Sequence, residues 1–151
     1  KSQGRRTFDP KSRLDRYRLR WNEVRYEPGE LKVVAYGADG KTAMAETVRT
    51  AGAPAAVRVE KRRFGRLLFA EATIVDKAGT PVPDADDALT VSVGAGLLFR
   101  AVCNGDATSV EPFHVPRMRA FHGKLVAICE GDGEEVGIVR DAASFGQSAR
   151  K

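Results

Sequence analysis

The sequence lacks any long hydrophobic run, and this excludes a helical membrane anchor within it. A transmembrane helix needs about 20 consecutive apolar residues, and no stretch of the 151 residues approaches that length. The start at Lys1 shows neither an initiator Met nor the pattern of a signal peptide. We therefore expect a soluble piece of a longer protein, with no membrane partner, whose targeting signals would lie outside this sequence.

Cysteine and histidine are scarce, with two residues of each. Cys103 and Cys129 lie in apolar, strand-like stretches and show no C-x-x-C spacing. Buried free thiols are the first interpretation, and a disulfide is the alternative if the protein works in an oxidising compartment. His114 and His122 have no Ser or Cys nucleophile pattern, so packing or hydrogen bonding explains them more simply than zinc or catalysis. The sequence therefore predicts no metal and no cofactor.

Positive charge is in excess, with 25 Lys and Arg against 20 Asp and Glu and a net charge of +5. In one basic segment three arginines alternate with three apolar residues: Arg16, Arg18 and Arg20 with Tyr17, Leu19 and Trp21. The period of two of a strand places the two sets on opposite faces. We interpret the arginines as a solvated face, because no RNA-binding, zinc-finger or helix-turn-helix pattern accompanies them. No nucleic-acid partner is predicted.

Turn signals occur at short intervals, and the stretches between them are rich in β-branched and aromatic residues. This spacing predicts an all-β protein, an immunoglobulin-like β-sandwich. The expected strands cover residues 17–26, 31–36, 42–50, 55–60, 67–76, 89–93, 97–103, 125–130 and 136–140.

Alternation along these strands predicts which side chains face the core. One expected row is Leu68, Ala70, Ala72 and Ile74, and another is Leu89, Val91 and Val93. The strand 125–130 is apolar on both faces, which predicts a central position in its sheet or cover from a neighbouring module.

A run of small, helix-hostile residues, Ala51–Pro54, interrupts the strand pattern and predicts a module boundary. We expect two modules, at residues 1–54 and 55–141. The remaining residues, 142–151, are rich in Gly, Ser, Gln and small side chains, and are predicted to form a flexible tail.

Two groups of motifs follow one another along the chain. The first group comprises residues 17–21, 24–31, 34–36, 39–41 and 47–55, and includes the string W-x-x-V-x-Y-x-P-G-x-L. The second comprises residues 75–79, 82–85, 104–106, 111–113 and 119–123. In this order they resemble the immunoglobulin-like module after the catalytic barrel, and then the C-terminal sandwich, of family 2 glycoside hydrolases of the β-galactosidase type.

The resemblance implies a non-catalytic accessory domain that supports the catalytic barrel and other modules of a parent enzyme. That parent would be a retaining glycoside hydrolase, periplasmic or secreted from a bacterium, with its catalytic carboxylates outside this chain. The sequence lacks the L-F-L-N-G-K-like segment that opens modules of the first kind. Residues 1–54 therefore resemble the C-terminal half of such a module. We expect its orphaned strands to pack on the second module or to pair with another copy.

The acidic residues do not suggest a catalytic pair. A retaining glycosidase needs two carboxylates about 5 Å apart, whereas the acidic runs fall in turn-rich segments: Asp84, Asp86 and Asp87, and Glu134 and Glu135. The 84–87 segment also lacks the Gly and terminal Glu of an EF-hand. We interpret it as a solvated acidic turn and predict no catalytic residues in this chain.

One set of residues suits carbohydrate binding, because aromatic rings stack on pyranose faces while amides and carboxylates bind hydroxyls. Its members are Asn104, Asp106, Glu111, Phe113, Arg119, Phe121 and His122. The simpler interpretation is a tight turn at residues 104–106, with Phe113 and Phe121 as core residues, and Trp21 also points inward by its strand phase.

Three functions are thus distinguished at this point. The first is a structural accessory domain. The second is a carbohydrate-binding module that holds polysaccharide near the parent's active site. The third, suggested by the basic charge alone, is an adhesion-type or nucleic-acid-binding sandwich unrelated to glycosidases.

Overall fold

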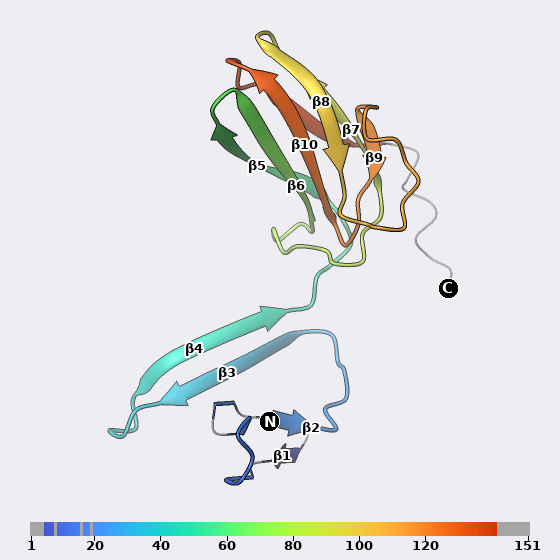
Figure 1. Ribbon diagram of the computed structural model, residues 1–151. Helices are drawn as coiled ribbons and strands as arrows, with labels where there is room; N and C mark the ends of the chain where they lie inside the picture. The colour runs from blue at the N-terminus through green and yellow to red at the C-terminus, as the bar shows by residue number, and fades with distance from the viewer. Residues whose placement is uncertain (1–4, 8, 16, 19, 142–151) are drawn as a thin grey trace. The chain divides into compact units, whose positions relative to one another are not determined.

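The computed structural model describes residues 5–7, 9–15, 17–18 and 20–141, and in that part of the chain all regular structure is β-strand (Figure 1). No helix long and apolar enough to cross a membrane occurs among these residues. Contacts divide the chain into two compact units, Lys1–Thr50 and Ala51–Lys151.

The first unit contains two small antiparallel ladders. β1 (Arg5–Thr7) pairs with β2 (Arg20–Asn22). β3 (Glu30–Tyr36) pairs with β4 (Thr42–Arg49), and Gly40, at φ +76°, lies in the turn that joins them. This hairpin agrees with the two strands and the Asp-Gly turn expected from the sequence.

The strand expected over residues 17–26 is wrong over most of its length, because only Arg20–Asn22 is paired. Glu23 has φ +61°, in the left-handed region that an extended strand does not tolerate. Tyr17 is 89% exposed and Trp21 39% exposed, so neither side chain is buried as its phase suggested. Two other members of the alternating pattern, Arg16 and Leu19, lie outside the described residues.

The basic strand face is solvated only in part. Arg18 is exposed, as expected, but Arg20 turns to a buried carboxylate and donates from Nη2 to Oδ2 of Asp15 at 2.8 Å. The Asp9 N–H donates to the same oxygen at 3.1 Å. The Arg20 hydrogen bond and this main-chain donor lower the pKa of Asp15.

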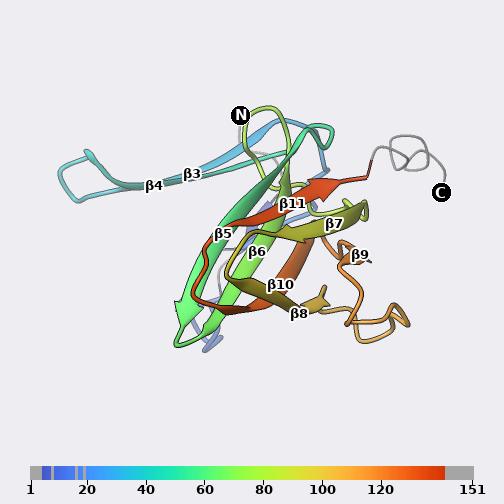
Figure 2. The same cartoon turned by 90° about the horizontal axis from the view of Figure 1, so that it is seen from above.

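The second unit is a sandwich of two antiparallel sheets, which Figure 2 shows from above. The four-stranded sheet has the order β5-β6-β10-β8, formed by β5 (Ala56–Phe64), β6 (Leu67–Val75), β10 (Lys124–Gly131) and β8 (Leu97–Cys103). The three-stranded sheet has the order β11-β7-β9, formed by β11 (Val136–Arg140), β7 (Ala88–Val93) and β9 (Arg117–Arg119). The prediction of an all-β, immunoglobulin-like fold is confirmed.

The core lies between these sheets and contains the predicted rows. Every member of the first row is buried: Leu68, Ala70, Ala72 and Ile74. In the second row Leu89 and Val91 are buried and Val93 packs partly buried against them. β10 lies between β6 and β8, which confirms its predicted central position.

The two cysteines lie on opposite faces of the four-stranded sheet and are both free. Cys129 is buried in the core, and this burial raises the pKa of its thiol. Cys103 is exposed, so the expectation of two buried thiols is wrong for this residue. It lies opposite Val126, whereas Cys129 lies opposite Phe99, and the ladder therefore keeps the two sulfur atoms apart.

The second unit holds the segment that leads into it, Ala51–Pro54, which the sequence placed at the end of the first module. Ala51 packs against the core, and the Gly52 N–H donates to Oδ2 of Asp76 at 2.8 Å. Arg140 Nη1 donates to the Pro54 carbonyl at 3.0 Å. The predicted tail, 142–151, lies outside the described residues.

Asp76 also closes the turn after β6. Its Oδ1 accepts the N–H groups of Ala78 and Thr80, each at 2.8 Å. The Gly52 donor, followed by Thr80 and then Ala78, lowers the pKa of this carboxyl. One ionised side chain therefore fixes both a turn and the entry of the chain into the sandwich.

We expect Asp76 to stabilise the second unit in a pH-dependent way. Because its folded-state pKa is lowered, its contribution is present above its unfolded pKa of about 3.9 and is lost as the pH falls through the folded value. The urea midpoint of the wild type should exceed that of Asp76→Ala at pH 7, and the gap should narrow below about pH 4. Lys77→Ala, an exposed change in the same turn, is the control. A gap that is constant with pH would contradict this role.

Candidate functional site

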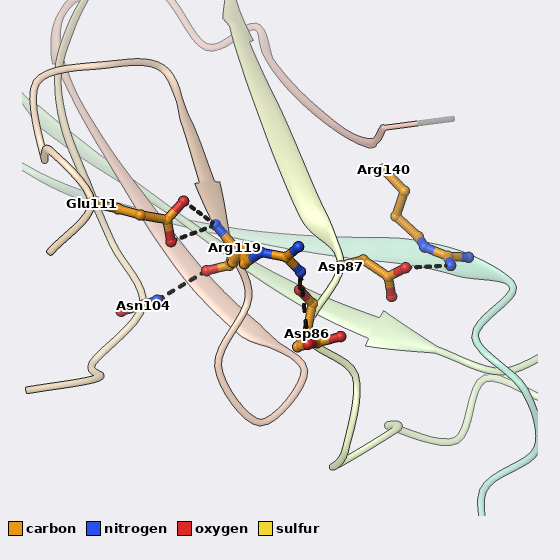
Figure 3. Close-up of polar contacts among 6 residues, drawn as sticks. All are labelled: Asp86, Asp87, Asn104, Glu111, Arg119 and Arg140. Carbon is orange, nitrogen blue, oxygen red and sulfur yellow. Dashed lines mark hydrogen bonds and ion pairs between the residues drawn. The ribbon is translucent and has the colours of Figure 1, made fainter. Parts of the chain in front are cut away.

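The residues proposed for sugar binding lie on the connection from β8 to β9, on β9 itself and on the turn that follows it. Figure 3 labels three of them, Asn104, Glu111 and Arg119. Their polar groups are engaged within the protein. Asn104 is buried, its Nδ2 donates to the Arg119 carbonyl at 3.0 Å, and its Oδ1 accepts the Asp106 N–H at 3.0 Å. The amide thus joins the end of β8 to the short strand β9.

Glu111 completes the attachment of β9. Both of its carboxylate oxygens accept the Arg119 N–H, at 3.3 and 3.2 Å. Arg119 therefore has its main-chain N–H and carbonyl bound by two side chains from the β8–β9 connection (Figure 3). An edge strand exposes such unpaired groups, and Asn104 and Glu111 satisfy them here.

Asp106 is committed to the same loop. Its Oδ1 accepts the Thr108 hydroxyl at 2.7 Å and the Thr108 N–H at 2.8 Å, and these bonds lower the pKa of the carboxyl. Gly105 has φ +80°, as the predicted tight turn requires. The turn interpretation of residues 104–106 is therefore confirmed.

The two aromatic residues are not core residues, so that interpretation is wrong. Phe113 is 53% exposed and Phe121 is 38% exposed. The interior positions of this region are occupied instead by Met118 and Ala120, which alternate with the outward residues of β9. Phe121 contacts the ring of His122, with 4.2 Å between the ring centroids.

A two-residue turn, His122 and Gly123, closed by the bridge between Phe121 and Lys124, attaches the segment before β7. Nδ1 of His122 lies 3.1 Å from the Pro83 carbonyl, which agrees with a hydrogen-bonding role for this histidine. Gly123 donates its N–H to the Ala85 carbonyl at 2.8 Å, and a Cβ there would collide with the Val82 carbonyl oxygen. Two motifs that are distant in sequence, 82–85 and 119–123, therefore pack on one another.

The acidic turn is solvated only in part. Asp84 and Asp86 are exposed, but Asp87 is buried and its Oδ1 accepts from Nη2 of Arg140 at 2.8 Å, with about nine-tenths of both side chains buried. The solvated interpretation is thus wrong for Asp87. The sequence held a signal for this pair, because both residues fall on the inward phase of strands whose other inward residues are apolar, such as Leu89 and Ile138.

The remaining candidates do not gather with this network. Glu134, Glu135 and His114 are exposed. Among the described residues there is no group of three His, Cys, Asp or Glu side chains that could hold a metal ion. The structure joins Asn104, Asp106, Glu111 and Arg119 through hydrogen bonds and brings Phe121 to His122, and Arg119 also donates from Nη1 to the Asp86 carbonyl at 3.0 Å. These hydrogen bonds attach the β8–β9 loop to the edge strand β9.

Comparisons with known proteins assign most of the second unit to one family. The model of Glycoside hydrolase family 2 C-terminal domain 5 matches residues 61–148, and a Domain of unknown function (DUF4982) matches residues 1–44. The chain is 33% identical over 140 residues to Beta-galactosidase BoGH2A of Bacteroides ovatus, covering 89% of this chain and 16% of that protein.

Two solved structures share the fold. A beta-glycosidase from Bacteroides vulgatus matches with a TM-score of 0.65 and 24% identity over 82% of this chain and 18% of its own. A glycosyl hydrolase family 2 member from Bacteroides cellulosilyticus matches with a TM-score of 0.69 and 19% identity over 83% of this chain and 20% of its own. The chain thus spans at most 20% of the length of these relatives.

We expect Asn104→Ala to loosen the β8–β9 connection. The change removes the hydrogen bonds to the Arg119 carbonyl and from the Asp106 N–H. At about 0.5–1.5 kcal/mol each, the two bonds together contribute about 1–3 kcal/mol. The free energy of unfolding should fall by about that amount, and amide exchange at Asp106 should accelerate. Asp132→Ala, in an exposed turn elsewhere, should stay within about 0.5 kcal/mol of wild type. Equal behaviour of the two variants would refute the attachment role.

Proposed function

The chain belongs to the family of glycoside hydrolase family 2 C-terminal domains, domain 5, and from this membership we propose that it is a non-catalytic module that supports the catalytic barrel of such an enzyme. The parent would be a retaining, β-galactosidase-like glycoside hydrolase whose catalytic carboxylates lie outside this chain. The partners of the module are then the barrel and other modules of the same polypeptide.

One observation carries this proposal. The amide and carboxylates best suited to bind sugar hydroxyls already form hydrogen bonds within the protein. Asn104 and Glu111 bind the main chain of β9, and Asp106 binds Thr108. A hydroxyl of a ligand would have to displace these contacts, which costs about as much as the new bonds would gain. A network of this kind favours a rigid scaffold over a binding pocket.

The attachment of Ala51–Pro54 supports the same role. This segment is bound by Asp76, by Arg140 and by the core, so the sandwich keeps a fixed grip on the chain that enters it. Arg140 is itself held by the buried carboxylate of Asp87. A module that positions its neighbours needs a connection of this kind, whereas a tethered binding module works well on a flexible linker.

We expect the purified chain to hydrolyse neither galactosides nor glucuronides. Chromogenic substrates should be cleaved at the rate of buffer alone, because the proposed supporting role leaves the catalytic carboxylates of the parent outside this chain. The double variant Glu134→Gln, Glu135→Gln, with both residues exposed on the surface, serves as the control. Turnover by the wild type would overturn the proposal, and its loss in this variant would assign the activity to these two residues.

A carbohydrate-binding role is the second candidate, and the exposure of Phe113 and Phe121 favours it. Exposed rings can stack on sugar faces without breaking the hydrogen-bond network below them. If this role holds, calorimetric titration with polysaccharides should give saturable binding that Phe113→Ala or Phe121→Ala weakens at least tenfold with an unchanged urea midpoint. Val110→Ala, at a residue 97% exposed in the same loop, is the matched control. Absence of binding by wild type would leave the supporting role alone.

A further inference from the structure

The connection between the two compact units is short and contains no regular structure. The last strand of the first unit, β4, ends at Arg49, and the first strand of the second unit, β5, begins at Ala56. The residues between them include Gly52 and Pro54, a composition that on its own suggests a flexible linker. The contacts of these residues show where the chain is held.

Thr50 is held by the first unit. Its N–H donates to the Gly29 carbonyl at 2.8 Å, and its Oγ1 accepts the Gly29 N–H at 3.0 Å. The Tyr26 hydroxyl donates to the same oxygen at 3.4 Å. The preceding residue, Arg49, lies opposite Glu30 in the ladder, and its Nε donates to Oε2 of Glu30 at 2.9 Å. The first unit therefore fixes Thr50 through both its main chain and its side chain.

Ala51, the next residue, is held by the second unit. It packs against the core of the sandwich. Its neighbour Gly52 donates its N–H to the buried carboxylate of Asp76 at 2.8 Å. The Pro54 carbonyl accepts from Nη1 of Arg140 at 3.0 Å, and Figure 3 shows the ion pair that holds this arginine. The segment that the composition suggests as a linker is therefore part of the sandwich.

The unit boundary thus falls between two adjacent residues that are each fixed, Thr50 and Ala51. The peptide group that joins them is planar, so ψ of Thr50 and φ of Ala51 are the soft rotations between the two points of attachment. Both rotations keep the two Cα atoms about 3.8 Å apart. A flexible linker of four residues would have a root-mean-square end-to-end distance of about 10–12 Å. The geometry is that of a joint and not of a tether.

We propose that the Thr50–Ala51 peptide is the hinge of this chain, so that the two units change orientation by rotation about these two bonds while residues 51–55 move with the sandwich. The inference goes beyond the supporting role, because it applies equally if the sandwich binds carbohydrate. Steric exclusion leaves a few allowed regions for each rotation, so the hinge permits a small set of orientations. A partner that contacts both units then loses less orientational freedom on binding than it would with a flexible linker.

Gly52 is the alternative hinge, because glycine tolerates a wider range of main-chain conformations than other residues do. Its N–H is bound by Asp76, and a Cβ built on it would lie 3.4 Å from Oδ2 of that residue, an ordinary van der Waals distance. The structure therefore has room for Gly52→Ala. This substitution would stiffen a hinge at residue 52 and would leave a hinge at Thr50–Ala51 unchanged.

Amide relaxation of the 151-residue chain measures whether both sides of the hinge are held. The N–H order parameters of Thr50 and Gly52 should be near 0.85, the value of about 0.85 that is typical of rigid backbone. A flexible linker would give values below about 0.6 at Gly52 and Ala53. Such low values would overturn the inference.

Residual dipolar couplings, which report how each unit aligns in a weakly ordered medium, test the joint itself. The wild type is compared with a variant in which Gly-Ser-Gly is inserted between Thr50 and Ala51. The alignment magnitudes of the two units should be closer to each other in the wild type, because two rotations transmit more orientation than many do. Equal ratios in the two proteins would show that the link is already free, and a single alignment tensor in the wild type would show that it does not move. Either result would overturn the inference.

Single substitutions separate the hinge from a general effect on folding. Thr50→Val keeps a β-branched side chain but removes the oxygen that accepts from Gly29, so the difference in alignment between the units should increase. Thr42→Val, at an exposed position at the other end of β4, and Gly52→Ala should both keep the wild-type difference. If Gly52→Ala changes the alignment and Thr50→Val does not, the hinge lies at Gly52 and the inference is wrong.

Discussion

The burial of alternate side chains between two sheets is the interaction on which the rest of the second unit depends. Inward residues of β6, β7 and β10, such as Ile74, Leu89 and Leu125, exclude water from the space between the sheets. Once these rows face each other, the outward residues of the same strands are also fixed in position. The outer face of the four-stranded sheet and the loop that carries Asn104 are therefore consequences of one packing arrangement.

Two buried carboxylates of the second unit, Asp76 and Asp87, lie at the margin of this core, and Asp87 forms an ion pair there with Arg140. Asp87 and Arg140 occupy inward positions at strand ends, where each pairs with the other beside the entering chain. A buried pair of this kind adds little net stability but is costly to break by removal of one partner. Its main effect is therefore on geometry and not on the melting temperature: the paired Arg140 holds the main chain at Pro54 in place.

Sequence patterns predicted most of this sandwich, because its long strands alternate regularly. β8 and β11 coincide with their expected bounds, and the resemblance to family 2 glycoside hydrolases is confirmed. β9 was missed because three residues, with Met118 between two arginines, are too few to show a period. Phe113 and Phe121 were misplaced for a different reason: outside a regular strand, hydrophobicity alone does not say whether a side chain faces the core.

At the candidate site, the sequence does not predict which groups the polar side chains bind. The residue types of Asn104, Glu111 and Arg119 suggested that these side chains bind a ligand. The structure does bring the three residues together, but the side chains of Asn104 and Glu111 bind the main-chain carbonyl and N–H of Arg119. Hydrogen bonds to main-chain groups leave no trace in composition, because any residue supplies the same N–H and carbonyl. The distinction between a binding loop and a structural one therefore needed coordinates.

The grip on Ala51–Pro54 also determines how the sandwich would bear mechanical load. The chain passes from this segment directly into β5, which pairs with β6 from Ala56 to Phe64 without a shift in register. A pull along that strand loads the whole ladder at once, in shear, in place of opening it one bond at a time. Asp76 and Arg140 also bind the segment where the chain enters the sandwich. Tension on the polypeptide would therefore be distributed over many hydrogen bonds of the module and would not act on one bond alone.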